Sequence, residues 1–120
     1  MKISDFIGML FLARDQAHAA HLSTRDLAEH MATNTFYHDV IDKADSFAEA
    51  YQGSYGLIGG IALQSVKRQE KILTFLENQV EEIKRERYTI CKKEETALQN
   101  LIDEIIELYL TTIYKLKFLS

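Results

Sequence analysis

Hydrophobic residues recur every three to four positions along most of the chain, which is the spacing of one face of an α-helix. This pattern predicts four helices, over residues 3–22, 25–52, 61–88 and 94–119. Ser23 or Thr24 is expected to cap the second helix, and Gly53 to end it. Residues 53–60 hold four of the five glycines and are expected to form a connector. The sequence therefore predicts an all-α four-helix bundle.

The last two predicted helices differ in how much apolar surface they carry. In the third, Val66, Leu73 and Val80 alternate with Gln69, Leu76 and Ile83 in a short heptad-like seam. The fourth is apolar on nearly every side, which is typical of a helix buried on more than one side. In a chain of 120 residues, we expect the extra side to meet another copy, so the bundle is predicted to self-associate.

Composition narrows the class of protein further. A length of 120 residues predicts one domain, over residues 1–120, and the absence of proline and tryptophan agrees with a helical fold. A formal charge of -4 argues against a duplex-DNA binder, because such binding needs clustered Lys and Arg. The sequence predicts neither a signal peptide nor a membrane span, and a single cysteine gives no internal disulfide. We therefore expect a cytoplasmic protein, in the host cytoplasm if a phage encodes it.

Candidate metal ligands gather in the second predicted helix. The four histidines all lie between residues 18 and 38, and Asp45 and Glu49 are one helical turn apart. One arc about 100° wide holds five polar side chains: His30, Asn34, His38, Asp45 and Glu49. His18 would approach this arc if the first two helices pack antiparallel. Imidazole and carboxylate ligands together suit iron, manganese or zinc. The alternative, left open by the spacing, is that this arc is simply the solvated side of the helix.

The spacing of these residues resembles that of the ferritin-like family of DNA-binding proteins from starved cells (Dps). That family has a His, a second His twelve residues later, an Asp four residues further, and then Asp-x2-Ala-Glu. Five residues of this chain match in type and spacing, within roughly residues 6–53: His18, His30, Asp45, Ala48 and Glu49. Asn34 stands where the family has Asp, and Ala19 stands where a Trp usually follows the first His.

The resemblance implies a ferritin-like bundle that oxidises and stores iron between two-fold related copies. His18 and His30 of one copy would face Asp45 and Glu49 of the other, so at least a dimer is expected. An amide is a poorer ligand for a hard cation than a carboxylate. Asn34 therefore leaves ferroxidase activity undecided, although His38, one turn along, offers a replacement. The compact chain also resembles small ferritin-like proteins of tailed phages.

A second interpretation is a non-enzymatic, phage-type protein that sequesters a nucleotide signal or blocks a host protein. It rests on Asn34, on the glycine-rich connector, and on six tyrosines that with Arg85 and Arg87 could stack on and clamp a nucleotide. Residues 53–60 lack the Gly-Lys-Ser/Thr ending of a P-loop, so a plain connector is favoured there. Cys91 has no cysteine partner and is expected to be an ordinary thiol. A structural subunit that binds no small ligand is the third interpretation.

Overall fold

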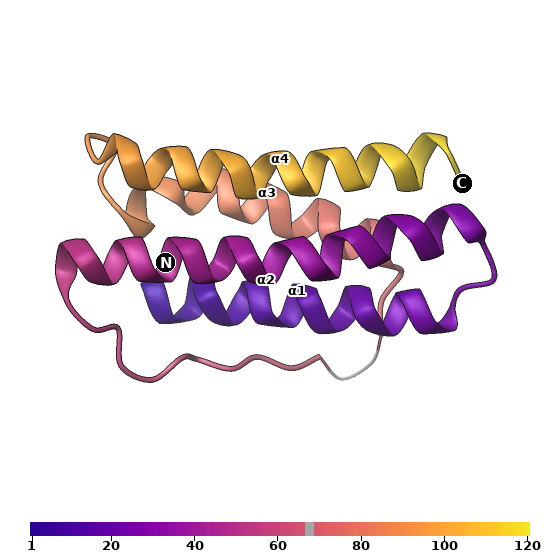
Figure 1. Cartoon of the computed structure of the whole chain (residues 1–120), viewed down its shortest axis with the longest axis horizontal. Helices are drawn as coiled ribbons and strands as arrows, with labels where there is room; N and C mark the ends of the chain where they lie inside the picture. The colour runs from indigo at the N-terminus through magenta and orange to yellow at the C-terminus, as the bar shows by residue number, and fades with distance from the viewer. Residues whose placement is uncertain (67–68) are drawn as a thin grey trace.

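The computed structural model describes residues 1–66 and 69–120, and over these residues it contains four helices and no strand. The helices are α1 (Ile3–Ser23), α2 (Leu27–Tyr55), α3 (Ile72–Ile90) and α4 (Thr96–Phe118). Both α1 and α4 pack against α2 and α3, giving a bundle that measures 44 × 26 × 21 Å. The predicted all-α four-helix bundle is confirmed at this level (Figure 1). No helix in the described part of the chain is long and apolar enough to cross a bilayer.

The connection between α2 and α3 sets the direction of the helices. α1 and α2 form one antiparallel hairpin, and α3 and α4 form another (Figure 1). α2 ends at the end of the bundle opposite to where α3 starts, so α2 and α3 run in the same direction (Figure 1). The described part of the connector returns beside α1, where the Ala62 N–H donates to the Ser4 carbonyl at 3.3 Å and Gln64 Nε2 donates to the Asp5 carbonyl at 2.9 Å.

The first part of the predicted third helix is wrong. Residues 61–66 and 69–71 are not helical, and residues 67–68 lie outside the described part of the chain. The predicted seam therefore lacks Val66 and Gln69 and begins within α3. The chain must travel back along the bundle here, and an extended residue advances about 3.3 Å against 1.5 Å for a helical one. The segment is therefore not helical, although its apolar spacing is, because it must span the length of the bundle and pack against α1.

Both predicted ends of the second helix also shift. Asp26, rather than Ser23 or Thr24, caps α2, since its carboxylate accepts a hydrogen bond from the Ala28 N–H at 3.0 Å. Gly53 is helical, and the helix ends at Gly56, whose φ of 91° favours glycine. The predicted break before the last helix is confirmed, because α3 ends at Ile90 and α4 begins at Thr96.

The interior of the bundle is mainly apolar, and buried hydrogen bonds through Gln79 link three of its helices. The Tyr109 hydroxyl donates to Gln79 Oε1 at 2.6 Å, and Gln79 Nε2 donates to the Met9 carbonyl at 3.2 Å. These bonds join α4, α3 and α1 in the core. Among the described residues, no Asp, Glu or His is buried. Any metal site built from the described side chains therefore belongs on the surface of the bundle.

Candidate functional site

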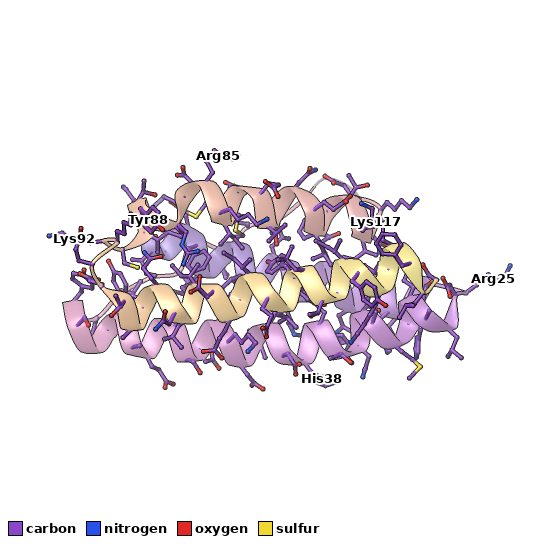
Figure 2. The ribbon with its side chains drawn as sticks, turned by 90° about the horizontal axis from the view of Figure 1, so that it is seen from above. Arg25, His38, Arg85, Tyr88, Lys92 and Lys117 are labelled. Carbon is purple, nitrogen blue, oxygen red and sulfur yellow. The ribbon has the colours of Figure 1, made fainter. Side chains whose placement is uncertain are left out.

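All four histidines gather around one tyrosine on the α1–α2 edge of the bundle. The His18 ring stacks on Tyr37 with 4.2 Å between centroids, and the rings of His21 and His38 lie 5.4 and 4.4 Å from it. His30 joins through His21, on which it stacks at 3.7 Å and 20° between planes. Figure 2 shows His38 on the outer edge of α2. The fold thus assembles an aromatic and imidazole cluster from two helices.

His21 and His30 lock one another in place at the α1–α2 turn. Three residues separate Ser23 from Leu27, so the last turn of α1 lies beside the first turn of α2. His21 Nδ1 lies 2.7 Å from the His30 carbonyl, and His30 Nδ1 lies 2.8 Å from the His21 carbonyl. A carbonyl oxygen only accepts, so each Nδ1 carries the hydrogen and donates it. In a neutral ring, this leaves the Nε2 lone pair available as a ligand.

The acidic part of the predicted site lies far along α2 from this histidine pair. Asp45 and Glu49 are both exposed, and Asp45 follows His30 by fifteen residues, which is about 22 Å along a helix. His38 is exposed between them, whereas Asn34 and His18 are half-buried. A single copy therefore brings together the histidines and, separately, the two carboxylates. Within the described residues, no group of three or more His, Cys, Asp or Glu side chains is placed to hold a metal ion.

Sequence reasoning missed His21 and Tyr37 as members of the cluster. His21 is three residues after His18, which puts both on one side of α1, but nothing in the spacing indicates that Tyr37 contacts both rings. The Arg14 guanidinium also lies 5.7 Å from the Tyr37 ring. These neighbours could only be identified once the crossing of α1 and α2 was known.

A hollow of about 590 Å³ adjoins the cluster where α2 begins and α4 ends. Polar, apolar and basic residues line it together: His21, His30, Asn34, Met31, Lys115 and Leu119. Lys115 is half-buried, and no carboxylate among the described residues lies within salt-bridge distance of it. Volumes of about 300–1,000 Å³ are usual for small-molecule sites. The hollow is therefore a second candidate for ligand binding.

Cys91, Arg87 and the tyrosines, which the sequence also singled out, make contacts within the bundle and do not form a common site. Cys91 is buried, accepts a hydrogen bond from Gln99 Nε2 at 3.1 Å, and burial raises the pKa of its thiol. Arg87 donates to the Gln99 side chain and carbonyl and to the Asp103 carboxylate. Its guanidinium also lies 5.4 Å from the exposed Tyr88 ring. The tyrosines do not form one cluster, since Tyr109 is in the core and Tyr88 is at the end of α3.

Comparison with known families covers most of the bundle. Residues 21–116 match a family described as "Family of unknown function (DUF5856)". The chain belongs to the DUF5856 family. The matched residues include five of the six predicted ligands of this DUF5856 chain, from His30 to Glu49, whereas His18 precedes them.

A phage protein is also similar to this DUF5856 chain. The chain is 27% identical over 115 residues to the "Uncharacterized 14.6 kDa protein in mobD-ri intergenic region" of Enterobacteria phage T4. The similarity covers 96% of this chain and 88% of the phage protein. No solved structure matches. A similar phage protein agrees with the expected phage type.

Proposed function

We propose that the protein is a small ferritin-like bundle that binds a divalent transition metal, iron or else manganese or zinc, between two copies. The order of its helices supports this proposal, because one long crossover between two antiparallel hairpins is the connectivity of ferritin-like bundles (Figure 1). The Dps-like spacing of His18, His30, Asp45 and Glu49 supports it independently.

The spacing along α2 carries the proposal. The midpoint between His30 and Glu49 coincides with the midpoint between Asn34 and Asp45, and both fall between residues 39 and 40. If the α2 helices of two copies cross antiparallel at that point, His30 of each copy lies opposite Glu49 of the other. Asn34 then lies opposite Asp45 in the same way. A two-fold contact of this kind creates two equivalent sites in each pair of copies.

The donor set fits a transition metal. His30 is oriented by the bond from its Nδ1 to the His21 carbonyl, an arrangement typical of metal-binding histidines. His18 is held by stacking on Tyr37. The two carboxylates offset the charge of a divalent ion, and the imidazoles favour iron, manganese or zinc over calcium. Iron(II) bound there would be the substrate for oxidation by peroxide or dioxygen. Asn34 is neutral, so this site would stabilise the oxidised ion with one negative charge fewer than a site with Asp at that position.

Calorimetric titration with Fe(II) under anaerobic conditions, and with Mn(II) and Zn(II), tests the proposal. We expect binding in the micromolar range with one ion per copy. Asp45→Ala should weaken that binding by about 100-fold or more, because loss of a partner that only orients a ligand already costs about 10–100-fold. Glu81→Ala, which removes an exposed carboxylate from α3, is the matched control and should leave it unchanged. Absence of binding by the unaltered protein would refute the proposal.

Mixing two variants tests whether the ligands come from different copies. His30→Ala and Asp45→Ala each remove a ligand from both sites of a homodimer. In a mixed dimer, the intact His30 of one copy meets the intact Asp45 of the other, so one of the two sites is restored. We therefore expect the mixture to regain binding with the affinity of the unaltered protein, which neither variant reaches alone. If the mixture binds no better than the separate variants, the ligands do not come from two copies.

A second candidate function is a non-enzymatic protein that sequesters a nucleotide signal or blocks a host protein. The observation that favours it is the hollow beside His21, with Lys115 in its wall and a rim of exposed apolar residues, Met31 and Leu119. A half-buried cation without a carboxylate partner suits an anionic group, and the apolar rim suits a planar or apolar body. The phage relative is consistent with such a role.

A thermal-shift panel of mononucleotides, cyclic nucleotides and ADP-ribose in the presence of EDTA tests this second candidate. A ligand that binds only the folded state raises Tm with its concentration. We expect such a rise with at least one nucleotide, and we expect Lys115→Met to abolish it. Lys117→Met, which removes a neighbouring exposed ammonium group on α4, is the control. A panel without any shift excludes the nucleotide role.

A further inference from the structure

The outward face of α4 carries an apolar stripe that no described residue of the chain covers. Leu110, Tyr114 and Phe118 follow one another at four-residue intervals and are 43%, 54% and 69% exposed. The Tyr114 and Phe118 rings lie 5.9 Å apart, so the stripe is continuous at this end. Large apolar side chains that are exposed singly are common, but a continuous exposed row on one helix indicates a contact surface.

Charged residues flank the stripe in a definite order. Glu107 is exposed about one helical turn before Leu110, the first residue of the stripe. Lys117 lies at the other end, next to Phe118. Lys117 makes a long ion pair, 3.8 Å from Glu77, in which both side chains are substantially exposed, and its ammonium group lies 6.0 Å from the Phe118 ring. Surface pairs of this kind contribute little to stability, so the ammonium group is free to change partners.

We propose that this stripe packs against the same stripe of a second copy, with the two α4 helices antiparallel. Residue 112 is the midpoint both between Leu110 and Tyr114 and between Glu107 and Lys117. A two-fold axis at that level places Leu110 opposite Tyr114 and Glu107 opposite Lys117, and it repeats each pair. A parallel arrangement would instead place Glu107 against Glu107 and Lys117 against Lys117. Charge complementarity therefore selects the antiparallel second copy as the occupant.

This contact is separate from the proposed metal site. The bonds from Arg87 to Asp103 and from Lys117 to Glu77 show that this face of α4 borders α3. Figure 2 shows Lys117 beside α3 and His38 on the far edge of α2. A chain with both two-fold contacts builds assemblies with an even number of copies, and either contact can be lost without the other.

Analytical ultracentrifugation in EDTA, which removes metal from the comparison, measures this contact. Glu107→Lys and Lys117→Glu should each weaken self-association by about tenfold or more, because each places like charges opposite one another. The double variant Glu107→Lys with Lys117→Glu restores opposite charges in the antiparallel arrangement and should regain association. Asn100→Lys adds a charge to the same helix further from the stripe and is the control. Failure of the double variant to recover would overturn the proposal.

Cysteine cross-linking tests the arrangement of the helices independently of affinity. A chain with Leu110→Cys mixed with a chain with Tyr114→Cys should form a heterodimeric disulfide faster than either forms a homodimer. Both positions are exposed, so the fold is expected to tolerate the changes, and circular dichroism checks this. Asp45→Ala should leave the cross-link intact while removing metal binding, which separates failure of this contact from failure of the metal site. No preference for the mixed pair would also overturn the proposal.

Discussion

Gly8→Ala is expected to lower the free energy of unfolding by about 2 kcal/mol, although alanine is the better helix former. Gly8 is buried in α1, and a Cβ at this position would overlap the carbonyl oxygen of Ala62 in the connector. The obstacle is backbone, not a flexible side chain, so the connector must move away from α1. That movement would lengthen or break the hydrogen bonds from the connector to the Ser4 and Asp5 carbonyls. Urea denaturation of both proteins measures the difference.

Gly53→Ala is the matched control, because Gly53 is also helical but a Cβ there would meet nothing within 4 Å. Replacing this exposed glycine in the last turn of α2 should raise the free energy of unfolding by up to about 0.5–1 kcal/mol. The two glycine substitutions should thus have opposite signs. If Gly8→Ala is stabilising to the same degree as Gly53→Ala, the connector does not lie against α1 as described.

Tyr109→Phe is expected to lower the free energy of unfolding by about 2 kcal/mol, because it leaves a buried amide oxygen without a donor. The Tyr109 hydroxyl is the partner of Gln79 Oε1, and both side chains are buried. The ring itself keeps its packing against Phe36, whose centroid is 5.0 Å away. Tyr114→Phe, which alters an exposed hydroxyl, should change stability little. Equal effects of the two substitutions would show that the buried bond contributes nothing.

The same hydroxyl predicts how stability changes in alkali. Burial holds the pKa of Tyr109 well above its ordinary value of 10.0. Above that ordinary value, the unfolded chain loses a proton that the folded chain keeps, so stability falls as pH rises. Tyr109→Phe removes this contribution and should flatten the dependence between neutral and alkaline pH. Denaturation series at several pH values compare the two slopes.

The sequence predicted the helical class and most helix positions because α2, α3 and α4 each bury one periodic face. In α2, the buried residues Phe36, Val40, Ala44 and Phe47 recur at the three- and four-residue intervals of one helix face, and Tyr51 continues that face half-buried. The prediction failed at the start of the third helix, where the chain packs against α1 and does not form a helix of its own. Ile61 and Ala62 have helix-compatible neighbours, but they cover α1 in an extended segment. Each end of α2 also offers more than one residue that could cap it. The helix begins after Asp26 and not after Thr24, and it ends at Gly56 and not at Gly53.

The candidate site was predictable only along one helix at a time. The shared arc of His30, His38, Asp45 and Glu49 on α2 follows from helical geometry and needs no structure. The stacking of His18 on Tyr37 and the paired bonds of His21 and His30 depend on how α1 crosses α2. Contacts of that kind arise from tertiary packing, which spacing within one helix does not encode.

The crossover between α2 and α3 also has a consequence for the order in which the chain folds. Short turns close each hairpin, of residues 24–26 in the first and 91–95 in the second, so their partners meet at small entropic cost. The Tyr109–Phe36 and Gln79–Met9 contacts, in contrast, join residues seventy or more positions apart. Local pairs form faster than distant ones. We therefore expect the two hairpins to form first, with their docking as the slow event in folding.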